Sequence, residues 1–316
     1  MFTVLFTSIG RRVELIKAFK ESYETHGVKS KVFGVDTAPS LAPASYFVDR
    51  CFKVPKAKEE GYVDSLLAIC EAEKVDLLIP LFEPEFLLLD ARRFEFARIN
   101  TCLLLSERRV IETCSDKFKT YQFFINNGIK TPYTWLQEAL PEMIRYPLFI
   151  KPRTGMGSQG AKKVESSEEL QFILQHEIDF LIQEHIPGKE YTLDILADLE
   201  GQVLSVVPRE RLEVRAGEVS KSRTLYRLDL IEQGKRIVEQ LGAIGPVTVQ
   251  CIDNGKELNW IEINPRFGGG VPLSIRAGVD YPYLLYQMVN MQDVKPLLGK
   301  YNHNLTMLRY DQAVYF

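Results

Sequence analysis

Residues 260–270 form a short segment with a polar face and a glycine-rich end, Trp260-Ile261-Glu262-Ile263-Asn264-Pro265-Arg266-Phe267-Gly268-Gly269-Gly270. Its first half alternates, which predicts a strand with Ile261 and Ile263 facing a core. Glu262 and Asn264 then project together from the opposite face, within reach of one cation. Pro265 ends the strand, and the glycines after it allow a backbone to approach a ligand closely.

A partner strand is predicted at residues 246–252, and Asp253-Asn254-Gly255-Lys256 predicts the hairpin turn between the two strands. Pairing across this turn places Gln250 beside Glu262. One carboxylate and two amide oxygens, from Gln250, Glu262 and Asn264, suit a Mg²⁺ ion that also holds phosphates. The alternative is that the polar face is only solvated, as exposed strand faces commonly are.

Composition restricts the class of protein. The chain has 316 residues, of which 46% are hydrophobic and 26% charged, and its net charge is −3. This length fits two or three domains, and the small net charge argues against nucleic acid or an anionic membrane as a partner. The start lacks the basic region of a signal peptide, and no apolar run approaches the ~18 residues of a membrane-spanning helix. The cysteines and histidines are dispersed, which predicts neither disulfides nor a zinc site. We therefore expect a cytoplasmic globular protein.

The first 112 residues alternate predicted strands and helices, which indicates a parallel, doubly wound sheet whose ligands bind at the carboxyl ends of its strands. The predicted strands are 3–6, 31–35, 75–80 and 101–105, and the predicted helices are 11–24, 62–74 and 86–96. The pattern changes after this region, and the main domain boundary is expected near residue 112.

The carboxyl end of the first predicted strand offers Ser8, Arg11 and Arg12, which are candidate ligands of an anionic or polar substrate. Asp36 ends the second strand, where a ribose-binding acid would lie, but the glycines of a dinucleotide site are missing here. The carboxylates of residues 80–85 face the same crevice. They either bind an amine or cap the helix that follows.

A glycine-rich loop follows an apolar strand that delivers Lys151. The loop formally spells G-x-G-x-x-G, but residues 161–164 predict a returning strand where the dinucleotide motif needs a helix. We expect a strand-loop-strand flap whose free backbone N–H groups close over phosphates. The loop residues expected at the phosphates are Gly155, Gly157, Ser158 and Gly160. A flexible hairpin without a ligand is the alternative.

The turn Ile186-Pro187-Gly188 exposes backbone N–H and C=O groups, the donor and acceptor that an adenine edge needs. Glu190 lies just past it, where a carboxylate can accept both ribose hydroxyls. A polar stretch at residues 208–224 then carries Arg209, Arg211, Lys221 and Arg223. Cations at this density, opposite a magnesium-binding pair, suit a phosphoryl group in transfer. As a charge run alone, the stretch would be a solvated surface.

In their order along the chain, these motifs resemble the ATP-grasp superfamily, and most closely one ATP-grasp half of the carbamoyl phosphate synthetase large subunit. The resemblance covers roughly residues 1–290. It implies a Rossmann-like α/β pre-ATP-grasp domain followed by a two-lobed α+β ATP-grasp fold. The expected segments are a pre-ATP-grasp domain at 1–112, an ATP-grasp domain at 113–293 with a lid lobe at about 130–185, and a C-terminal tail at 294–316.

The resemblance also implies roles for individual residues. The residues expected to bind ATP, besides the glycine loop, are Lys117, Lys151, Glu184, His185, Ile186 and Glu190. The residues expected to hold two Mg²⁺ ions, with Mn²⁺ as an alternative, are Gln250, Glu262 and Asn264. The expected catalytic cations are Arg266, Lys221 and Arg223. The candidate substrate residues are Ser8, Arg11, Arg12 and Arg211.

The implied activity is an ADP-forming ligase reaction on small molecules. A carboxylate attacks the γ-phosphorus of ATP, and an amine or similar nucleophile then displaces phosphate from the acyl phosphate. We favour a stand-alone carboxylate–amine ligase. The alternatives are a subunit of a split carbamoyl phosphate synthetase, which uses bicarbonate and ammonia, and a nucleotide-binding protein without catalysis. Relatives of this fold are often dimers, so a homodimer stays open.

Overall fold

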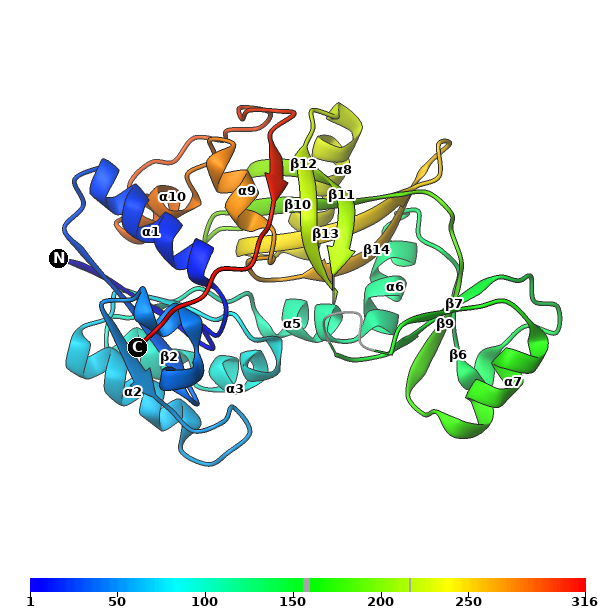
Figure 1. The fold of residues 1–316 in the computed structure, drawn as a ribbon, viewed down its shortest axis with the longest axis horizontal. Helices are drawn as coiled ribbons and strands as arrows, with labels where there is room; N and C mark the ends of the chain where they lie inside the picture. Colours follow the sequence, from blue (N-terminus) through cyan, green and yellow to red (C-terminus); the bar gives the residue numbers. More distant parts are fainter. Residues whose placement is uncertain (156–159, 216) are drawn as a thin grey trace.

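The computed structural model describes residues 1–155, 160–215 and 217–316. In this part of the chain the strands form sheets of five, six and four strands. The five-stranded sheet is parallel and the other two are antiparallel. Figure 1 shows the parallel sheet and the four-stranded sheet on opposite sides of the six-stranded one. This arrangement confirms the predicted fold class, a parallel α/β domain followed by a two-lobed α+β fold.

The parallel sheet has the strand order β3-β2-β1-β4-β5. Its strands are β1 (Phe2–Phe6), β2 (Ser30–Asp36), β3 (Arg50–Lys53), β4 (Leu77–Ile79) and β5 (Cys102–Leu103). The α-helices of this region are α1 (Val13–Thr25), α2 (Tyr62–Glu73), α3 (Phe86–Ala91), α4 (Arg93–Arg98) and α5 (Arg108–Ser115). Short 3₁₀ helices lie at η1 (Pro39–Leu41), η2 (Pro43–Tyr46) and η3 (Glu83–Glu85).

Two sequence predictions in this region were wrong in detail. The edge strand β3 was not predicted, because its two apolar residues lie between Arg50 and Lys53 and show no period. The single helix expected at 86–96 is two helices, because the backbone of Arg92 leaves the helical region at φ −118° and ψ 21°. Neither difference alters the carboxyl edge of the sheet, where the loops after β1 and β4 meet.

The parallel sheet is buried on both faces, as such sheets are when helices cover them. Val4 and Phe6 belong to a core on the face covered by α1, whereas Leu5 belongs to the core on the face of α2, α3 and α4. Buried positions therefore alternate along β1 between two cores. This explains why apolar residues are consecutive at positions 4–6 of the strand and do not alternate with polar ones.

The six-stranded sheet has the order β14-β13-β10-β11-β12-β15. Its strands are β10 (Lys189–Ala197), β11 (Val203–Arg215), β12 (Glu218–Thr224), β13 (Gly245–Asp253), β14 (Leu258–Asn264) and β15 (Thr306–Leu308). The polar stretch at 208–224 is thus largely strand, and its Arg209 is buried against Asp194 at 2.6 Å. Gln250 pairs directly with Glu262 across the β13–β14 hairpin. This confirms the predicted pairing. The predicted alternation was wrong on one side of it, because a β-bulge between Gln250 and Cys251 shifts the register. Trp260 lies in the core with Ile263, whereas Ile261 is only partly buried.

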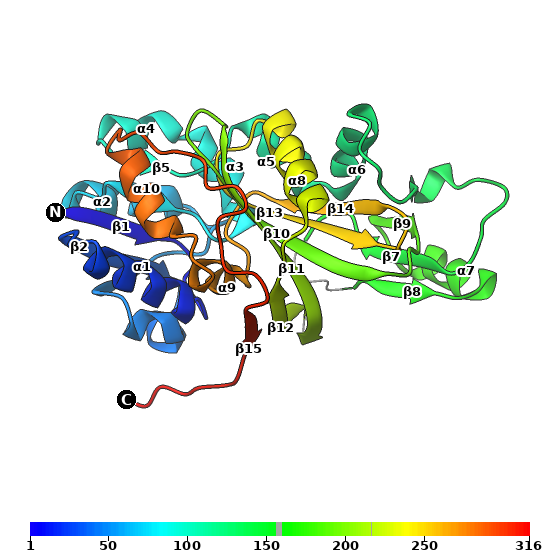
Figure 2. The same ribbon diagram turned by 90° about the horizontal axis from the view of Figure 1, so that it is seen from above.

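The four-stranded sheet has the order β6-β9-β7-β8 and forms a lobe of its own with helix α7 (Figures 1 and 2). Its elements are β6 (Thr134–Leu136), η4 (Gln137–Ala139), β7 (Leu148–Pro152), β8 (Lys162–Val164), α7 (Ser167–His176) and β9 (Phe180–Glu184). Helix α6 (Lys117–Asn126) precedes the lobe, and the Asp116 carboxylate caps it by accepting the N–H groups of Phe118 and Lys119. The lobe has a separate apolar core, which includes Leu148, Ile150 and Ile182.

The N-terminal domain is packed firmly against the six-stranded sheet. Helix α1 contacts α9 (Val271–Arg276) and α10 (Tyr281–Val289), while α8 (Leu228–Leu241) packs against β10 and β11. The rings of Phe19 and Phe267 meet edge to face, with centroids 6.0 Å apart. One apolar core therefore joins the parallel sheet to the loop that follows β14. Within the described ranges, no helix has the length and apolar character needed to cross a membrane.

Candidate active site

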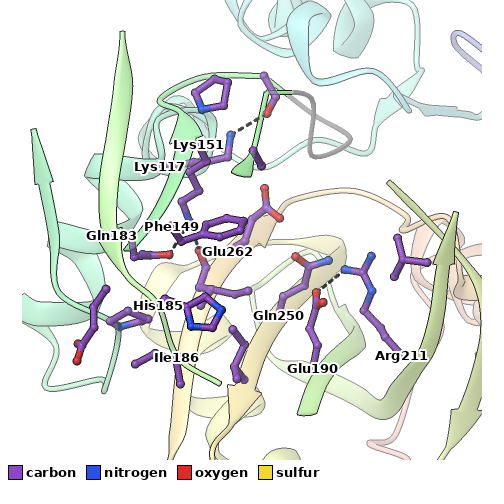
Figure 3. Close-up of a pocket in the computed structure, with 18 of the residues that line it drawn as sticks. Lys117, Phe149, Lys151, Gln183, His185, Ile186, Glu190, Arg211, Gln250 and Glu262 are labelled. Atoms are coloured by element: carbon purple, nitrogen blue, oxygen red, sulfur yellow. Dashed lines mark hydrogen bonds and ion pairs between the residues drawn. The ribbon is translucent and has the colours of Figure 1, made fainter. Parts of the chain in front are cut away.

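A cavity of about 330 Å³ lies between the four-stranded and the six-stranded sheet (Figure 3). Its lining includes Lys117, Phe149, Lys151, Gly155, Gln183, Glu184, His185, Ile186, Glu190, Arg211, Gln250 and Glu262. The fold thus brings together residues from both lobes that lie up to 145 positions apart, as from Lys117 to Glu262. Of the remaining loop residues, Gly157 and Ser158 lie outside the described ranges, and Gly160 is not part of the lining.

The strand period places neighbours of the predicted ligands in the same cavity. Phe149 lies two residues before Lys151 on β7, and Ile252 lies two residues after Gln250 on β13, so each pair shares a face. Sequence analysis had not singled out these apolar residues, although the same period would have found them. It also missed Gln183, which pairs with Phe149 across β7 and β9. A lone amide within an apolar strand was the available signal.

Lys151 is almost fully buried, and its ammonium group points into the cavity (Figure 3). Its Nζ donates to Gln183 Oε1 at 3.2 Å and to the Ile261 carbonyl at 3.5 Å. Gln183 is held in turn because its Nε2 donates to Thr134 Oγ1 at 2.7 Å. Burial lowers the pKa of Lys151 to about 8, and the nearby Glu262 carboxylate opposes this shift. The side chain is therefore a cation with few neutralising contacts, which favours an anionic ligand.

Lys117 approaches the cavity from the first turn of α6. Its Nζ donates to the Gly155 carbonyl at 2.9 Å, at the start of the glycine-rich loop. Gly155 has a φ of +106°, which side chains other than glycine rarely adopt, so the loop requires glycine there. Arg153 further anchors the loop base through an ion pair of 2.7 Å with Asp116. The loop base and the α6 N-terminus are thus connected at the entrance to the cavity.

A chain of polar contacts runs along the floor of the cavity, on the six-stranded sheet. Arg211 forms an ion pair with Glu190. In the orientation of the Gln250 amide that satisfies both neighbours, its oxygen accepts from Arg211 Nη1 at 3.0 Å and its Nε2 donates to Glu262 Oε2 at 2.7 Å. Burial raises the pKa of Glu190, and Arg211 opposes that shift. These contacts connect Glu190, the predicted ribose-binding residue, to Gln250 and Glu262, two of the predicted metal ligands.

The predicted metal ligands provide one carboxylate and two amides. Glu262 and Asn264 are two residues apart on β14, and buried Ile263 between them faces the core. In the described parts of the chain, no three His, Cys, Asp or Glu side chains converge on one point. A cation here would rely on few protein ligands, which is how proteins commonly hold Mg²⁺ together with substrate phosphates. The donor set therefore fits Mg²⁺ bound with a nucleotide, although Asn264 does not line the cavity.

The segment between β9 and β10 connects the two lobes beside the cavity. Glu184, His185 and Ile186 line it, as expected of a segment next to a base. Gly188 follows, and a Cβ at this position would lie 2.3 Å from the Asp253 carbonyl oxygen. The backbone therefore crosses the end of β13 too closely for any side chain. This close approach fixes where the segment enters the cavity wall.

The loops after β1 and β4 meet at the carboxyl edge of the parallel sheet, where the strand order reverses. Glu85 is fully buried there and accepts hydrogen bonds from Thr7 Oγ1, Tyr62 OH and the Phe82 N–H. Burial raises the pKa of Glu85 to about 7. The acidic loop was predicted either to bind an amine or to cap the helix that follows, and Glu85 caps the helix. Asp36 is also occupied, because it accepts the N–H groups of Gly10 and Ala38.

Glu83, on the same loop, contacts the segment that follows β14. Its Oε1 lies 2.8 Å from Arg266 Nη2, and both side chains are nearly buried. The Nε atoms of Arg266 and Arg211 are buried and have no hydrogen-bond partner among the described residues. Buried donors without partners are rare in folded proteins. Each therefore indicates a place for an acceptor from a ligand.

Several candidate residues lie away from the cavity. Lys221 pairs with Glu213 at 2.7 Å and Arg223 pairs with Glu210 at 3.0 Å, and each cation is about half exposed on β12. Neither lines the cavity. Ser8, Arg11 and Arg12 lie at the carboxyl edge of the parallel sheet, whereas Arg211, predicted beside them as a substrate residue, lies in the cavity. The roles of these residues stay predictions.

Comparison with known protein families identifies the domains. Residues 114–270 match the model of an ATP-grasp domain, and residues 4–104 match that of the PylC-like N-terminal domain. The chain therefore carries an ATP-grasp domain preceded by a PylC-like N-terminal domain, and the predicted family is confirmed. The lobes of the four-stranded and six-stranded sheets, with the cavity between them, correspond to the ATP-grasp match.

Two curated relatives cover most of the chain. It is 26% identical over 303 residues to the carbamoyl phosphate synthase large chain of Clostridium beijerinckii, a match to 86% of this chain and 27% of that protein. It is 26% identical over 291 residues to the 3-methyl-D-ornithine–L-lysine ligase of Methanosarcina acetivorans, a match to 89% of this chain and 74% of that protein. The chain thus spans about a quarter of the synthase and three quarters of the ligase.

Solved structures share the fold at lower identity. A biotin carboxylase complex from Campylobacter jejuni superposes with a TM-score of 0.76 at 16% identity, covering 96% of this chain and 74% of that chain. The L-amino acid ligase of Bacillus licheniformis superposes with a TM-score of 0.66 at 22% identity, covering 94% of this chain and 78% of that chain. These matches extend over the N-terminal domain as well as both ATP-grasp lobes.

Proposed function

We propose that this protein is an ATP-dependent, ADP-forming ligase that activates a carboxylate as an acyl phosphate and transfers the acyl group to an amine or similar nucleophile. The observation that carries the proposal is the pairing of cations with a polar chain in one cavity. Lys117 and Lys151 line the cavity together with a series of hydrogen-bonded side chains on the six-stranded sheet. These side chains are Arg211, Gln250 and Glu262. Such a space, with cations on one wall and cation ligands on the other, suits a nucleoside triphosphate.

The cavity offers separate surfaces for the parts of ATP. Phe149, Ile186 and Ile252 are apolar members of the lining, which suit the faces of an adenine base. Glu190 is a partly buried carboxylate with a raised pKa, and ribose hydroxyls would donate to it. Lys117 and Lys151 would bind the phosphates, aided by the backbone of the glycine-rich loop. Bound phosphates would stabilise the positive charge that burial disfavours on Lys151.

Magnesium would be held by Glu262, Gln250 and Asn264 together with the phosphate oxygens. When bound, it would neutralise phosphate charge and so ease attack by an anionic carboxylate on the γ-phosphorus. The residues of this chain would position that attack. Lys151 and Arg266 would stabilise the negative charge on the transferring phosphoryl group, and the lobe of the four-stranded sheet would exclude water from the acyl phosphate.

The reaction then proceeds in two displacements. A carboxylate oxygen forms a bond to the γ-phosphorus while the bond to the β–γ bridging oxygen breaks, which yields ADP and an acyl phosphate. The nucleophile next attacks the acyl carbon, and phosphate leaves as the amine loses a proton. Neither step needs a covalent bond to the protein. This agrees with a cavity whose lining contains no cysteine or serine among the described residues.

The experiment measures ADP and phosphate release from Mg-ATP across a matrix of carboxylates and amines, with bicarbonate plus ammonia as one combination. We expect release that requires one carboxylate and one amine together. Release with bicarbonate and ammonia alone would instead support a carbamoyl phosphate synthase-type subunit, in line with the match to part of such a chain. Wells without acid and wells without amine are the controls. Absence of Mg-ATP binding would contradict the proposal.

A further inference from the structure

Arg12 is a partly buried cation that has no ion-pair partner among the described residues. It precedes α1 at the carboxyl edge of the parallel sheet, and its Nη1 lies 3.5 Å from where a Cβ on Gly269 would stand. No carboxylate of the described residues lies within the 4.0 Å of an ion pair with it. Its guanidinium also makes no hydrogen bond to another side chain in the described ranges. An unpaired charge in such a place costs free energy unless a ligand neutralises it.

The surroundings of Arg12 have an excess of positive charge. Burial, and next the charge of Arg266, lower the pKa of Arg12 to about 10, so it remains a cation at neutral pH. Arg309 adds a third cation, and its Nη2 donates to the Gly269 carbonyl. Glu218, whose charge opposes the lowering of the Arg12 pKa, is already shared between Arg309 at 3.3 Å and Arg11 at 3.9 Å. Glu83 is likewise occupied by Arg266. Among the described residues, the carboxylate that acts on Arg12 is therefore one that two other arginines already share.

Arg309 is held in place by the C-terminal segment. Strand β15 pairs with β12, and the Arg309 N–H donates to the Ser220 carbonyl at 2.9 Å. Its side chain is then fixed by Glu218 and by the Val219 carbonyl. The C-terminal segment thus supplies a positioned cation to the junction between the N-terminal domain and the loop after β14.

The segment that follows β14 leads from the nucleotide cavity to Arg12, because Glu262 on β14 lines the cavity and Gly269 lies beside Arg12. The charges that act on Glu83, the partner of Arg266, are those of Arg266, Glu262 and Lys117, two of which line the cavity. The charges that act on Arg12 are those of Arg266, Glu218 and Arg309, and none of these lines it. Along this segment, Arg266 lies between cavity-lining Glu262 and Gly269, the neighbour of Arg12. A substrate whose reacting carboxylate lies near Arg266 would extend its other end toward Arg12.

We propose that Arg12, with Arg309 across the Gly269 backbone, binds a second anionic group of the acid substrate, so that this substrate carries a carboxylate or phosphate besides the carboxylate that is phosphorylated. The inference rests on the proposed function and narrows its substrate class to acids with two anionic groups. Arginine suits this task because its planar fork donates two parallel hydrogen bonds to one carboxylate or phosphate.

The test is calorimetric binding of acids to the full chain in the presence of Mg-ADP. Malonate, succinate and glutarate are compared with acetate, propionate and butyrate, and 3-phosphonopropionate separates a phosphate preference from a carboxylate preference. Because a charge-assisted hydrogen bond contributes about 1.5–3 kcal/mol, we expect one dianion to bind at least about tenfold more tightly than its monoacid. Arg12→Gln should abolish this discrimination, and Arg12→Lys should retain only part of it.

The control is Arg98→Gln, which removes the same charge from an exposed position on α4. It should leave the discrimination intact. Because Arg12 forms no ion pair within the described ranges, Arg12→Gln should not lower the melting temperature of the free protein, and Arg309→Gln serves as a second variant. Equal binding of dianions and monoacids by the wild type, or unchanged discrimination in Arg12→Gln, would overturn the inference. Mg-ATP binding is measured in parallel, so that the two proposals can be tested separately. If the wild-type protein does not bind Mg-ATP, the proposed ligase function itself is overturned.

Discussion

Glu83 and Arg266 form an ion pair of 2.8 Å that joins the N-terminal domain to the end of β14. Glu83 belongs to the loop after β4 at the edge of the parallel sheet, and Arg266 follows the predicted metal ligand Asn264 by two residues. Burial raises the pKa of Glu83, and the Arg266 charge opposes the shift. The N-terminal domain therefore reaches the loop expected to contact the transferring phosphoryl group and orients its arginine.

Substitution Glu83→Gln should lower acid-dependent turnover more than it lowers ATP binding. Without the carboxylate, Arg266 loses the contact that fixes its fork, and we expect a fall of roughly tenfold or more in kcat/KM for the acid. The dissociation constant of Mg-ATP should change little, because Glu83 does not line the cavity. Glu73→Gln, which removes the partner of exposed Arg50, is the matched control. An unchanged kcat/KM would contradict this role of Glu83.

Substitution Glu262→Gln should abolish Mg²⁺-dependent ATP turnover while the protein stays folded. The carboxylate is the one negative charge of the predicted metal set, and its loss should reduce turnover by at least about a hundredfold. Glu257→Gln alters an exposed residue just before the same strand and should have no effect. ADP release and thermal unfolding are measured for both variants. Turnover within a factor of about two of wild type would remove Glu262 from the metal site.

Substitution Lys151→Met should abolish the stabilisation by Mg-ATP without lowering the stability of the free protein. Saturating Mg-ATP at ~100 times its Kd should stabilise the wild type by about 2.7 kcal/mol if it binds only the folded state, and the variant should lose this effect. The free variant should melt at the same or a higher temperature, because burial disfavours the charged ammonium and lowers the pKa of Lys151. Lys151→Arg keeps the charge and is the control. A full Mg-ATP shift in Lys151→Met would contradict the phosphate contact.

The buried Glu85 should make stability depend on pH. Its pKa of about 7 in the folded protein lies above the ordinary value, so the folded state retains a proton that the unfolded chain releases. The stability that Glu85 contributes is therefore greatest below about pH 4.5 and declines as pH rises to 7. Glu85→Gln removes this dependence. Relative to wild type, the variant should gain up to about 3 kcal/mol between pH 4.5 and 7.5.

The measurement for Glu85 is urea unfolding of both proteins at several pH values. Other titrating groups act equally on the two proteins, so they cancel in the difference between their free energies of unfolding. Tyr62→Phe, which removes one donor to the Glu85 carboxylate, should raise its pKa further and shift the decline to higher pH. A difference between wild type and Glu85→Gln that stays constant with pH would contradict the assignment.

The local pattern of the chain was sufficient for those parts of the site that lie on single strands or hairpins. A short turn pairs β13 with β14, which brings Gln250 close to Glu262. The exact register was not predictable by counting, because a β-bulge between Gln250 and Cys251 shifts the pairing by one residue. The position of Lys151, at the end of a strand and directly before the glycine-rich loop, was likewise predictable from neighbouring residues alone. The parallel sheet was also predictable, because alternating strands and helices leave few other arrangements.

Contacts between distant segments were decided by the packing of the domains. Nothing in the composition of the acidic loop says that Glu83 meets Arg266 while Glu85 is buried against Thr7 and Tyr62, since both carboxylates have similar neighbours in sequence. The difference arises because α1 packs onto α9 and α10 and so places one edge of the parallel sheet against the loop after β14.

The packing of the domains also explains why Arg12 is partly buried. Local sequence marks it as a basic residue beside a strand end, equivalent to its neighbour Arg11. Tertiary packing places Arg12 beside Gly269 and partly buries it, while the Arg11 side chain remains 83% exposed. Short-range periodicity and turn chemistry therefore specify which side chains share a face. Which faces meet, and which charges are left without a partner, depends on burial of apolar surface between segments far apart in the chain.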